Sequence, residues 1–92
     1  MRVKLCGRHY NVRRVRLKND WGQCDPPTVA GKEIRLDIGM SEHRELDTII
    51  HEGLHACGWD VLDEAWVERA AHDLAKLVLK LGYRRVDEGG TS

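Results

Sequence analysis

The most regular pattern in the chain is the alternation of charged and apolar residues over positions 32–38. Because successive side chains of a strand point to opposite faces, this segment is predicted to be a strand buried on one face. Residues 2–6 and 9–17 have less regular alternation and predict two further strands joined by a turn. Residues 19–28, dense in turn-forming residues such as Asp and Pro, are predicted to be a loop. Together these segments predict a small three-stranded antiparallel sheet.

In the second half of the chain, the spacing of apolar residues has the period of an α-helix. Apolar residues recur every three or four positions, which is typical of helices buried on one side. The first helix is predicted to begin at its cap Ser41 and to end at Gly58 in a left-handed conformation. The second is predicted to begin after Asp60 or Asp63 and to end near Leu81. Its predicted core stripe consists of Val67, Ala70, Ala71, Leu74, Val78 and Leu81.

Strands followed by two long helices predict an α+β fold, with the three-stranded antiparallel sheet packed on an antiparallel pair of helices. The chain has 92 residues, which is enough for one domain with a modest core. We expect that domain to span residues 1–85. Residues 86–92 are polar and contain glycine, and they predict a flexible C-terminal tail.

One segment of the first helix has the residues of a metal site. His51, Glu52 and His55 form a His-Glu-x-x-His pentad. Helical side chains four residues apart lie one turn above each other, so both imidazoles can reach one ion. The spacing predicts a zinc site in which Glu52 lies beside the ion and accepts a proton from a bound water. Gly53 predicts close packing against that turn. A surface helix whose histidines bind nothing is the alternative.

A catalytic zinc ion needs a third protein ligand. A metzincin is excluded, because Val61 stands six residues after His55, where that family has its third ligand. Glu64 is predicted to be the ligand here, because in an antiparallel helix pair it lies at the height of His55 and leans toward the first helix. Glu68, one turn further on, is predicted to orient a ligand histidine or to replace Glu64 as ligand. Ordinary solvated carboxylates are the alternative for both.

Composition restricts the class of protein. Hydrophobic residues are 41% and charged residues 33% of the chain, as in ordinary soluble proteins. No apolar run is long enough to span a membrane, and the first residues do not form a signal peptide. We therefore expect a cytoplasmic protein without a membrane partner. Cys6, Cys24 and Cys57 include no Cys-x-x-Cys pair, which predicts free thiols.

The net charge is zero, but the charges are unevenly placed along the chain. The first 18 positions contain seven basic residues and no acidic one, whereas residues 41–80 are rich in acids. Such a basic region can bind nucleic acid. It contains one aromatic residue, Tyr10, and no RNA-binding signature, so a solvated sheet face is the favoured interpretation.

The pentad followed by Glu64-x-x-x-Glu68 resembles the gluzincin arrangement of zinc metallopeptidases, reduced to a minimal domain. Over about residues 1–85 the chain is also similar to small metallopeptidase-like proteins of phages and bacteria. Three motifs carry this similarity: Trp-Gly-x-Cys-Asp-Pro-Pro, Gly-Lys-Glu-Ile and Leu-Asp-Glu-Ala-Trp-Val-Glu-Arg. The resemblance implies that the strand at 32–38 is an edge that binds extended peptide, with Ile34, Arg35 and Leu36 as substrate-binding residues.

The resemblance also implies one Zn²⁺ ion and hydrolysis of an extended peptide or protein, with Glu52 as general base. His72, Tyr83 and Arg84 are alternatives for the group that stabilises the oxyanion. Two other functions stay open. One is a zinc-bound binding or regulatory module without catalysis, and the other is a nucleic-acid-associated protease of the SprT-like type. A monomer or a weak homodimer is expected.

Overall fold

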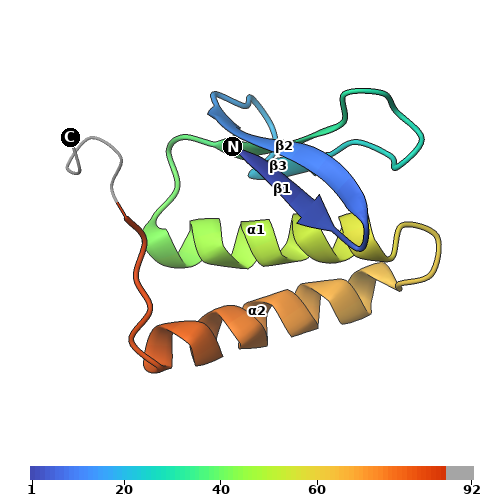
Figure 1. Cartoon of the computed structure of the whole chain (residues 1–92). Helices are drawn as coiled ribbons and strands as arrows, with labels where there is room; N and C mark the ends of the chain where they lie inside the picture. Colours follow the sequence, from blue (N-terminus) through green and yellow to red (C-terminus); the bar gives the residue numbers. More distant parts are fainter. Residues whose placement is uncertain (87–92) are drawn as a thin grey trace.

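The computed structural model describes residues 1–86, and the chain folds into four strands and two helices (Figure 1). The predicted α+β class is confirmed. The predicted tail over 86–92 lies outside the described residues, except for Val86. Within residues 1–86, neither helix is long and apolar enough to cross a membrane. The elements are β1 (Arg2–Leu5), β2 (Arg8–Val15), β3 (Gly22–Cys24), β4 (Glu33–Asp37), α1 (Glu42–Cys57) and α2 (Glu64–Lys80).

The sheet is mixed, with the spatial order β1-β2-β4-β3. β1 and β2 form the expected antiparallel hairpin, β2 and β4 are parallel, and β3 is antiparallel to β4. The prediction of three antiparallel strands was therefore wrong. Residues 16–32 are long enough to return the chain to the start of β2 before β4 begins, which permits parallel pairing. They also contain β3, a three-residue strand in the segment predicted to be a loop.

The face of the sheet that meets α1 contains the core. Val12 pairs with Ile34 and Arg14 pairs with Leu36, and paired residues of neighbouring strands lie on the same face. The alternation predicted for 32–38 is therefore the alternation of buried and outward positions along β4. The buried cluster comprises Tyr10, Val12, Ile34, Leu36, Met40 and Ala56.

The molecule has three layers, and α1 lies between the sheet and α2 (Figure 1). α1 contacts β1, β3 and β4 as well as α2, whereas α2 contacts no strand of the described chain. The predicted arrangement placed both helices on the sheet. Among the helices and strands of residues 1–86, the second helix packs on α1 alone.

The side of α2 that faces α1 is built from small residues. Val67, Ala71 and Ala75 are fully buried, whereas Leu74 and Leu81 are 42% and 67% exposed. The predicted core stripe is correct for Val67 and Ala71 and wrong for the two leucines. Small side chains at the contact allow the two helix axes to approach closely. Side chains on the flank of this contact can therefore meet across the gap.

Side-chain caps define both helix starts. Ser41 and Asp63 each accept a hydrogen bond from the backbone N–H three residues further on. Gly58 follows α1 with φ −124°, so the predicted left-handed cap is wrong. A Cβ there would lie 2.5 Å from Cγ of Leu62, so glycine permits the tight turn into α2. Among the described residues, apart from its chain neighbours and the backbone of α1, no atom lies within 4 Å of a Cβ built on Gly53, so the close packing predicted there is absent.

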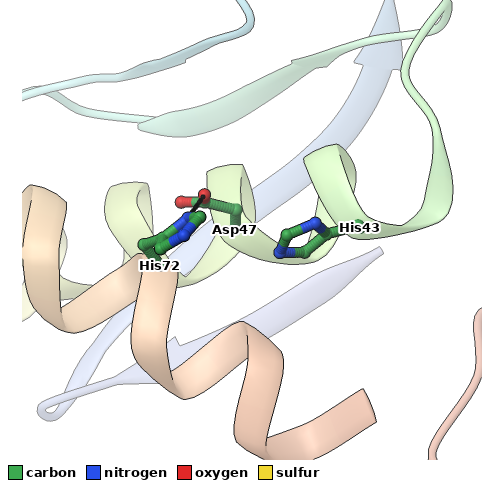
Figure 2. A group of neighbouring side chains, drawn as sticks. All are labelled: His43, Asp47 and His72. Carbon is green, nitrogen blue, oxygen red and sulfur yellow. Dashed lines mark hydrogen bonds and ion pairs between the residues drawn. The ribbon is translucent and has the colours of Figure 1, made fainter.

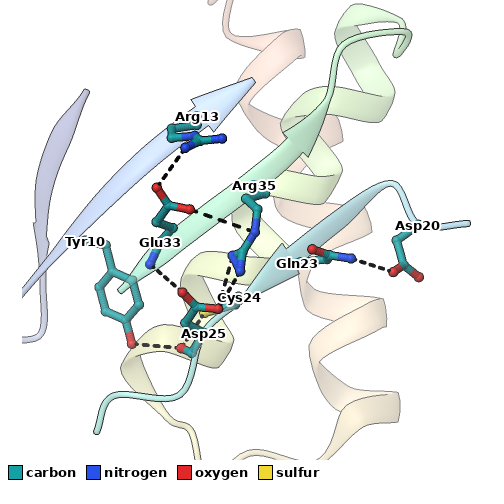
Figure 3. Close-up of polar contacts among 8 residues, drawn as sticks. All are labelled: Tyr10, Arg13, Asp20, Gln23, Cys24, Asp25, Glu33 and Arg35. Atoms are coloured by element: carbon teal, nitrogen blue, oxygen red, sulfur yellow. Dashed lines mark hydrogen bonds and ion pairs between the residues drawn. The ribbon is translucent and has the colours of Figure 1, made fainter. Parts of the chain in front are cut away.

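Hydrogen bonds of Asp25, which follows β3 directly, connect this short strand to β4 (Figure 3). Its carboxylate accepts hydrogen bonds from the backbone N–H of Glu33 at 2.9 Å and from the guanidinium of Arg35 at 2.7 Å. Its carbonyl oxygen accepts a hydrogen bond from the hydroxyl of Tyr10 at 3.5 Å. A three-residue strand has few ladder bonds of its own, so these contacts set the position of the sheet edge.

Candidate metal centre

α1 brings His51 and His55 together one turn apart. Their ring centroids are 4.8 Å apart, and their Nε2 atoms are 3.2 Å apart. The side chains are 21% and 20% exposed. Two imidazoles thus present the same ring nitrogen to one point at the end of the helix, as the four-residue spacing predicted.

Glu64, the first residue of α2, completes the cluster. Its Oε1 lies 3.0 Å from Nε2 of His51, and its Oε2 lies 2.7 Å from Nε2 of His55. The Asp63 cap and the short connection after α1 hold Glu64 at this height. Its side chain is 59% exposed, so the cluster opens to solvent on the side of α2.

The three side chains fit a zinc ion. In a tetrahedral site with bonds of about 2.0–2.1 Å, neighbouring donor atoms lie about 3.3 Å apart. The separations here run from 2.7 to 3.2 Å, which is close to that spacing. One donor atom from each residue lies within 4.8 Å of the other two. Two histidines and one glutamate are also a donor set of catalytic zinc sites, which keep a fourth position open.

Glu52 lies beside this cluster, on the side nearer the sheet. Burial raises the pKa of its carboxyl, against the lowering effect of His51 and His55. A carboxylate with a raised pKa is a stronger proton acceptor at neutral pH, which suits a general base. A Cβ on Gly22 would lie 3.2 Å from Cγ of Glu52. The sheet edge therefore closes directly over the Glu52 side chain.

An open cleft of about 760 Å³ runs past the cluster between the two helices and the start of β3. Trp21 stands at its border, 53% exposed, with its ring centroid 5.2 Å from the guanidinium carbon of Arg44. Asp20 and Gly22 border the same side. Sequence reasoning did not assign these residues to the site. The Trp-Gly pair in the loop motif was the available signal, but it did not show which element the loop would approach.

Other predicted site residues lie at different positions. Glu68 lines the cleft one turn beyond Glu64 but is not part of the three-residue cluster. His72 also lines the cleft. Tyr83 and Arg84 line a separate groove near the end of α2. Of the three candidates for stabilising an oxyanion, His72 is thus the one that lines the same cleft as the cluster.

The predicted edge position of β4 was wrong, because β4 pairs with both β2 and β3. Ile34 and Leu36 are 0% and 2% exposed and belong to the core. The guanidinium of Arg35 is held by Asp25. These three side chains are therefore not available to a substrate in the way the resemblance implied. The strand edge next to the cluster belongs to β3.

The cysteines are free, as predicted. Burial, followed by the negative charge of Glu52, raises the pKa of the Cys24 thiol to about 12. A thiol with so high a pKa stays protonated at neutral pH and is a poor nucleophile. The donor atoms that lie together are those of His51, His55 and Glu64, without Cys24, so the donors of the cluster are nitrogen and oxygen.

No known protein family, curated protein or solved structure matches this chain. The gluzincin resemblance thus rests on the residues named above. The fold and the cluster define a small α+β protein with a histidine-carboxylate centre at the contact of two helices.

Proposed function

We propose that this chain is a zinc-dependent metallopeptidase that cleaves extended peptide or protein substrates. The observation that supports this most is the convergence of His51, His55 and Glu64 on one point beside Glu52. A zinc ion held there would supply a Lewis acid for the peptide carbonyl and a lowered pKa for water.

Glu52 acts as the proton carrier in this proposal. Its carboxylate takes a proton from the attacking water and delivers it to the amine that leaves. Glu52 also lines the open cleft, so the attacking water can reach its carboxylate. The half-buried histidines and the exposed Glu64 leave access to the centre from the open cleft.

The outer edge of β3 is the binding place that the fold offers to an extended substrate. Trp21 and Asp25, at the two ends of β3, form backbone hydrogen bonds with β4. Because such bonds alternate along an antiparallel strand, the peptide groups of Gly22 and Cys24 point away from β4. An extended peptide can pair with them as an added strand. Gly22 borders the cleft, so the paired peptide would pass the metal centre.

Metal content tests the centre. Wild type, Glu64→Ala and the matched control Glu68→Ala are purified without added metal, incubated with Zn²⁺, desalted and examined by elemental analysis. We expect Glu64→Ala to hold about one zinc ion per chain fewer than wild type and Glu68→Ala to match wild type. A loss in Glu68→Ala with none in Glu64→Ala would make Glu68 the ligand. Equal zinc content in all three would contradict the proposed centre.

Activity tests the reaction. Cleavage of a peptide library by the zinc-loaded wild type is compared with cleavage by Glu52→Gln, which keeps the shape of the side chain but cannot take a proton. We expect Glu52→Gln to lose a factor of about 10²–10⁴ in rate while its zinc content is unchanged. If zinc-loaded wild type cleaves no peptide, the non-catalytic zinc module becomes the correct function.

A nucleic-acid-associated protease is the weaker alternative. Arg13 and Arg14, two of the seven basic residues near the N-terminus, form ion pairs with Glu33 and Glu45. Those two guanidinium groups are thus already matched by carboxylates within the fold. Nucleic-acid binding that weakens steeply with salt would support this alternative, and a flat salt response would exclude it.

A further inference from the structure

A second group of metal-binding side chains lies between the helices, away from the first centre. His43 and Asp47 come from α1, and His72 comes from α2. Nδ1 of His72 is 3.2 Å from Oδ2 of Asp47, and the ring centroids of His43 and His72 are 5.6 Å apart. One donor atom from each residue lies within 4.8 Å of the other two. Figure 2 shows the three side chains directed toward one another across the gap between α1 and α2.

One atom of this group has no partner in the described part of the chain. Nε2 of His43 is shielded from solvent and forms no hydrogen bond. Buried polar atoms without a partner are rare in folded proteins, and a bound ion is one of their ordinary explanations. A ring nitrogen that carries a lone pair is the atom that a histidine offers to a metal. The unpartnered Nε2 of His43 therefore supports metal binding independently of the distances between the three side chains.

The donors select the class of metal. Two imidazole nitrogens and one carboxylate suit zinc and related divalent transition metals, whereas Ca²⁺ and Mg²⁺ take oxygen ligands. His72 is 47% exposed on its side chain, so an ion can enter from the open cleft. We infer that His43, Asp47 and His72 form a second zinc site that fastens α2 to α1.

The arrangement repeats that of the first centre, displaced along both helices. Its two ligands on α1 stand eight residues before the histidines of the pentad, and His72 stands eight residues after Glu64. With a rise of about 1.5 Å per residue, the two sites lie about 12 Å apart. Two metals that share one reaction lie about 3.5–4 Å apart. The second ion therefore takes no part in the reaction proposed at the first centre, and with two ligands from α1 and one from α2 it links the two helices.

The experiment counts zinc ions in the full chain after incubation with Zn²⁺ and removal of unbound metal. We expect two per chain in wild type, one in His43→Ala/His72→Ala and one in His51→Ala/His55→Ala. His9→Ala, which removes an exposed histidine of β2 outside both groups, is the matched control and should keep both ions. If His43→Ala/His72→Ala holds as much zinc as wild type, the second site is overturned. An unchanged content in His51→Ala/His55→Ala would instead overturn the first.

A second measurement covers the case in which the double variant folds poorly. His72→Gln replaces a half-exposed ring by a neutral side chain of similar reach, in the background His51→Ala/His55→Ala. We expect Zn²⁺ at about a hundredfold its Kd to raise the Tm of the background by about 10 °C and of the His72→Gln chain by much less. Mg²⁺ should leave both unchanged. Equal shifts with Zn²⁺ in the two chains would contradict the site.

Discussion

At the scale of single residues, the Arg14 and Glu45 pair joins the sheet to α1. Nε and Nη2 of Arg14 donate to the two carboxylate oxygens of Glu45 at 3.0 and 2.9 Å. Glu45 is 8% exposed. The hydrogen bond from Arg14 lowers the pKa of the Glu45 carboxyl, and the charge of Arg85 acts in the same direction. Since the pKa is lower in the folded state, the pair stabilises the fold above the unfolded pKa, about 4.3, and this stabilisation disappears as the pH falls through the folded value.

Arg14→Met should therefore lower the free energy of unfolding by about 2 kcal/mol at pH 7. This is less than the value for a fully buried pair, because the Arg14 side chain is 36% exposed. Urea unfolding at pH 7 and at pH 3 measures the effect, and the difference from wild type should shrink at the lower pH. Arg13→Met is the matched control, since its pair with Glu33 is 49% exposed on the arginine side and should cost about 0.5 kcal/mol or less. Equal losses in both variants would contradict this account.

At the scale of elements, the approach of β3 to α1 depends on Gly22. A Cβ there would lie 2.6 Å from Cγ2 of Thr48, which is buried and short. Gly22→Ala should therefore push β3 away from α1 and lower the free energy of unfolding by about 1–3 kcal/mol. It should also lower the proposed peptidase activity, because Glu52 and the strand edge lie at the same contact. Thermal unfolding and peptide cleavage measure the two effects.

The clash between a Cβ at position 22 and Cγ2 of Thr48 can also be removed by a substitution at Thr48. Thr48→Ser removes Cγ2 but keeps the hydroxyl that donates to Sδ of Met40. In the double variant Gly22→Ala/Thr48→Ser, most of the lost stability should return. Gly53→Ala is the control for a glycine without close neighbours, and it should stabilise α1 by about 0.5–1 kcal/mol. A Gly22→Ala chain as stable as wild type would show that β3 can shift freely.

At the scale of the whole molecule, α2 contacts α1 and none of the four strands described within residues 1–86. Glu64 and His72 would tie it to α1 at the two metal sites. Removal of zinc by a chelator should therefore open α2 before the sheet. Where zinc is at about a hundredfold the Kd of each site, amide hydrogen exchange in α2 should become about 100-fold faster for each ion that chelation removes.

Amides of β2 and β4 are the internal control for that experiment. They pair in the centre of the sheet and lie far from α2 in the layer order, so their exchange should change little. Equal acceleration in the sheet and in α2 would mean that metal loss unfolds the whole chain. No acceleration anywhere would contradict a stabilising role for bound metal.

The sequence by itself determined the features that depend on neighbours within one or two turns. The four-residue spacing of His51 and His55, the Ser41 cap and the alternation along 32–38 all follow from the period of a single helix or strand. The position of Glu64 near His55 was also predictable, because a short connection brings the end of one helix and the start of the next to the same height.

Tertiary structure alone decided which elements meet. The parallel pairing of β2 with β4 and the place of β3 at the edge depend on the path of residues 16–32, and no local period encodes that path. The face that α2 turns toward α1 buries Ala75 and leaves Leu74 exposed, since small residues allow close approach to α1. The same orientation of α2 about its axis also places His72 next to Asp47, although the two are 25 residues apart in the sequence. Contacts between distant residues depend on how whole faces pack, so they appear only when the chain is folded.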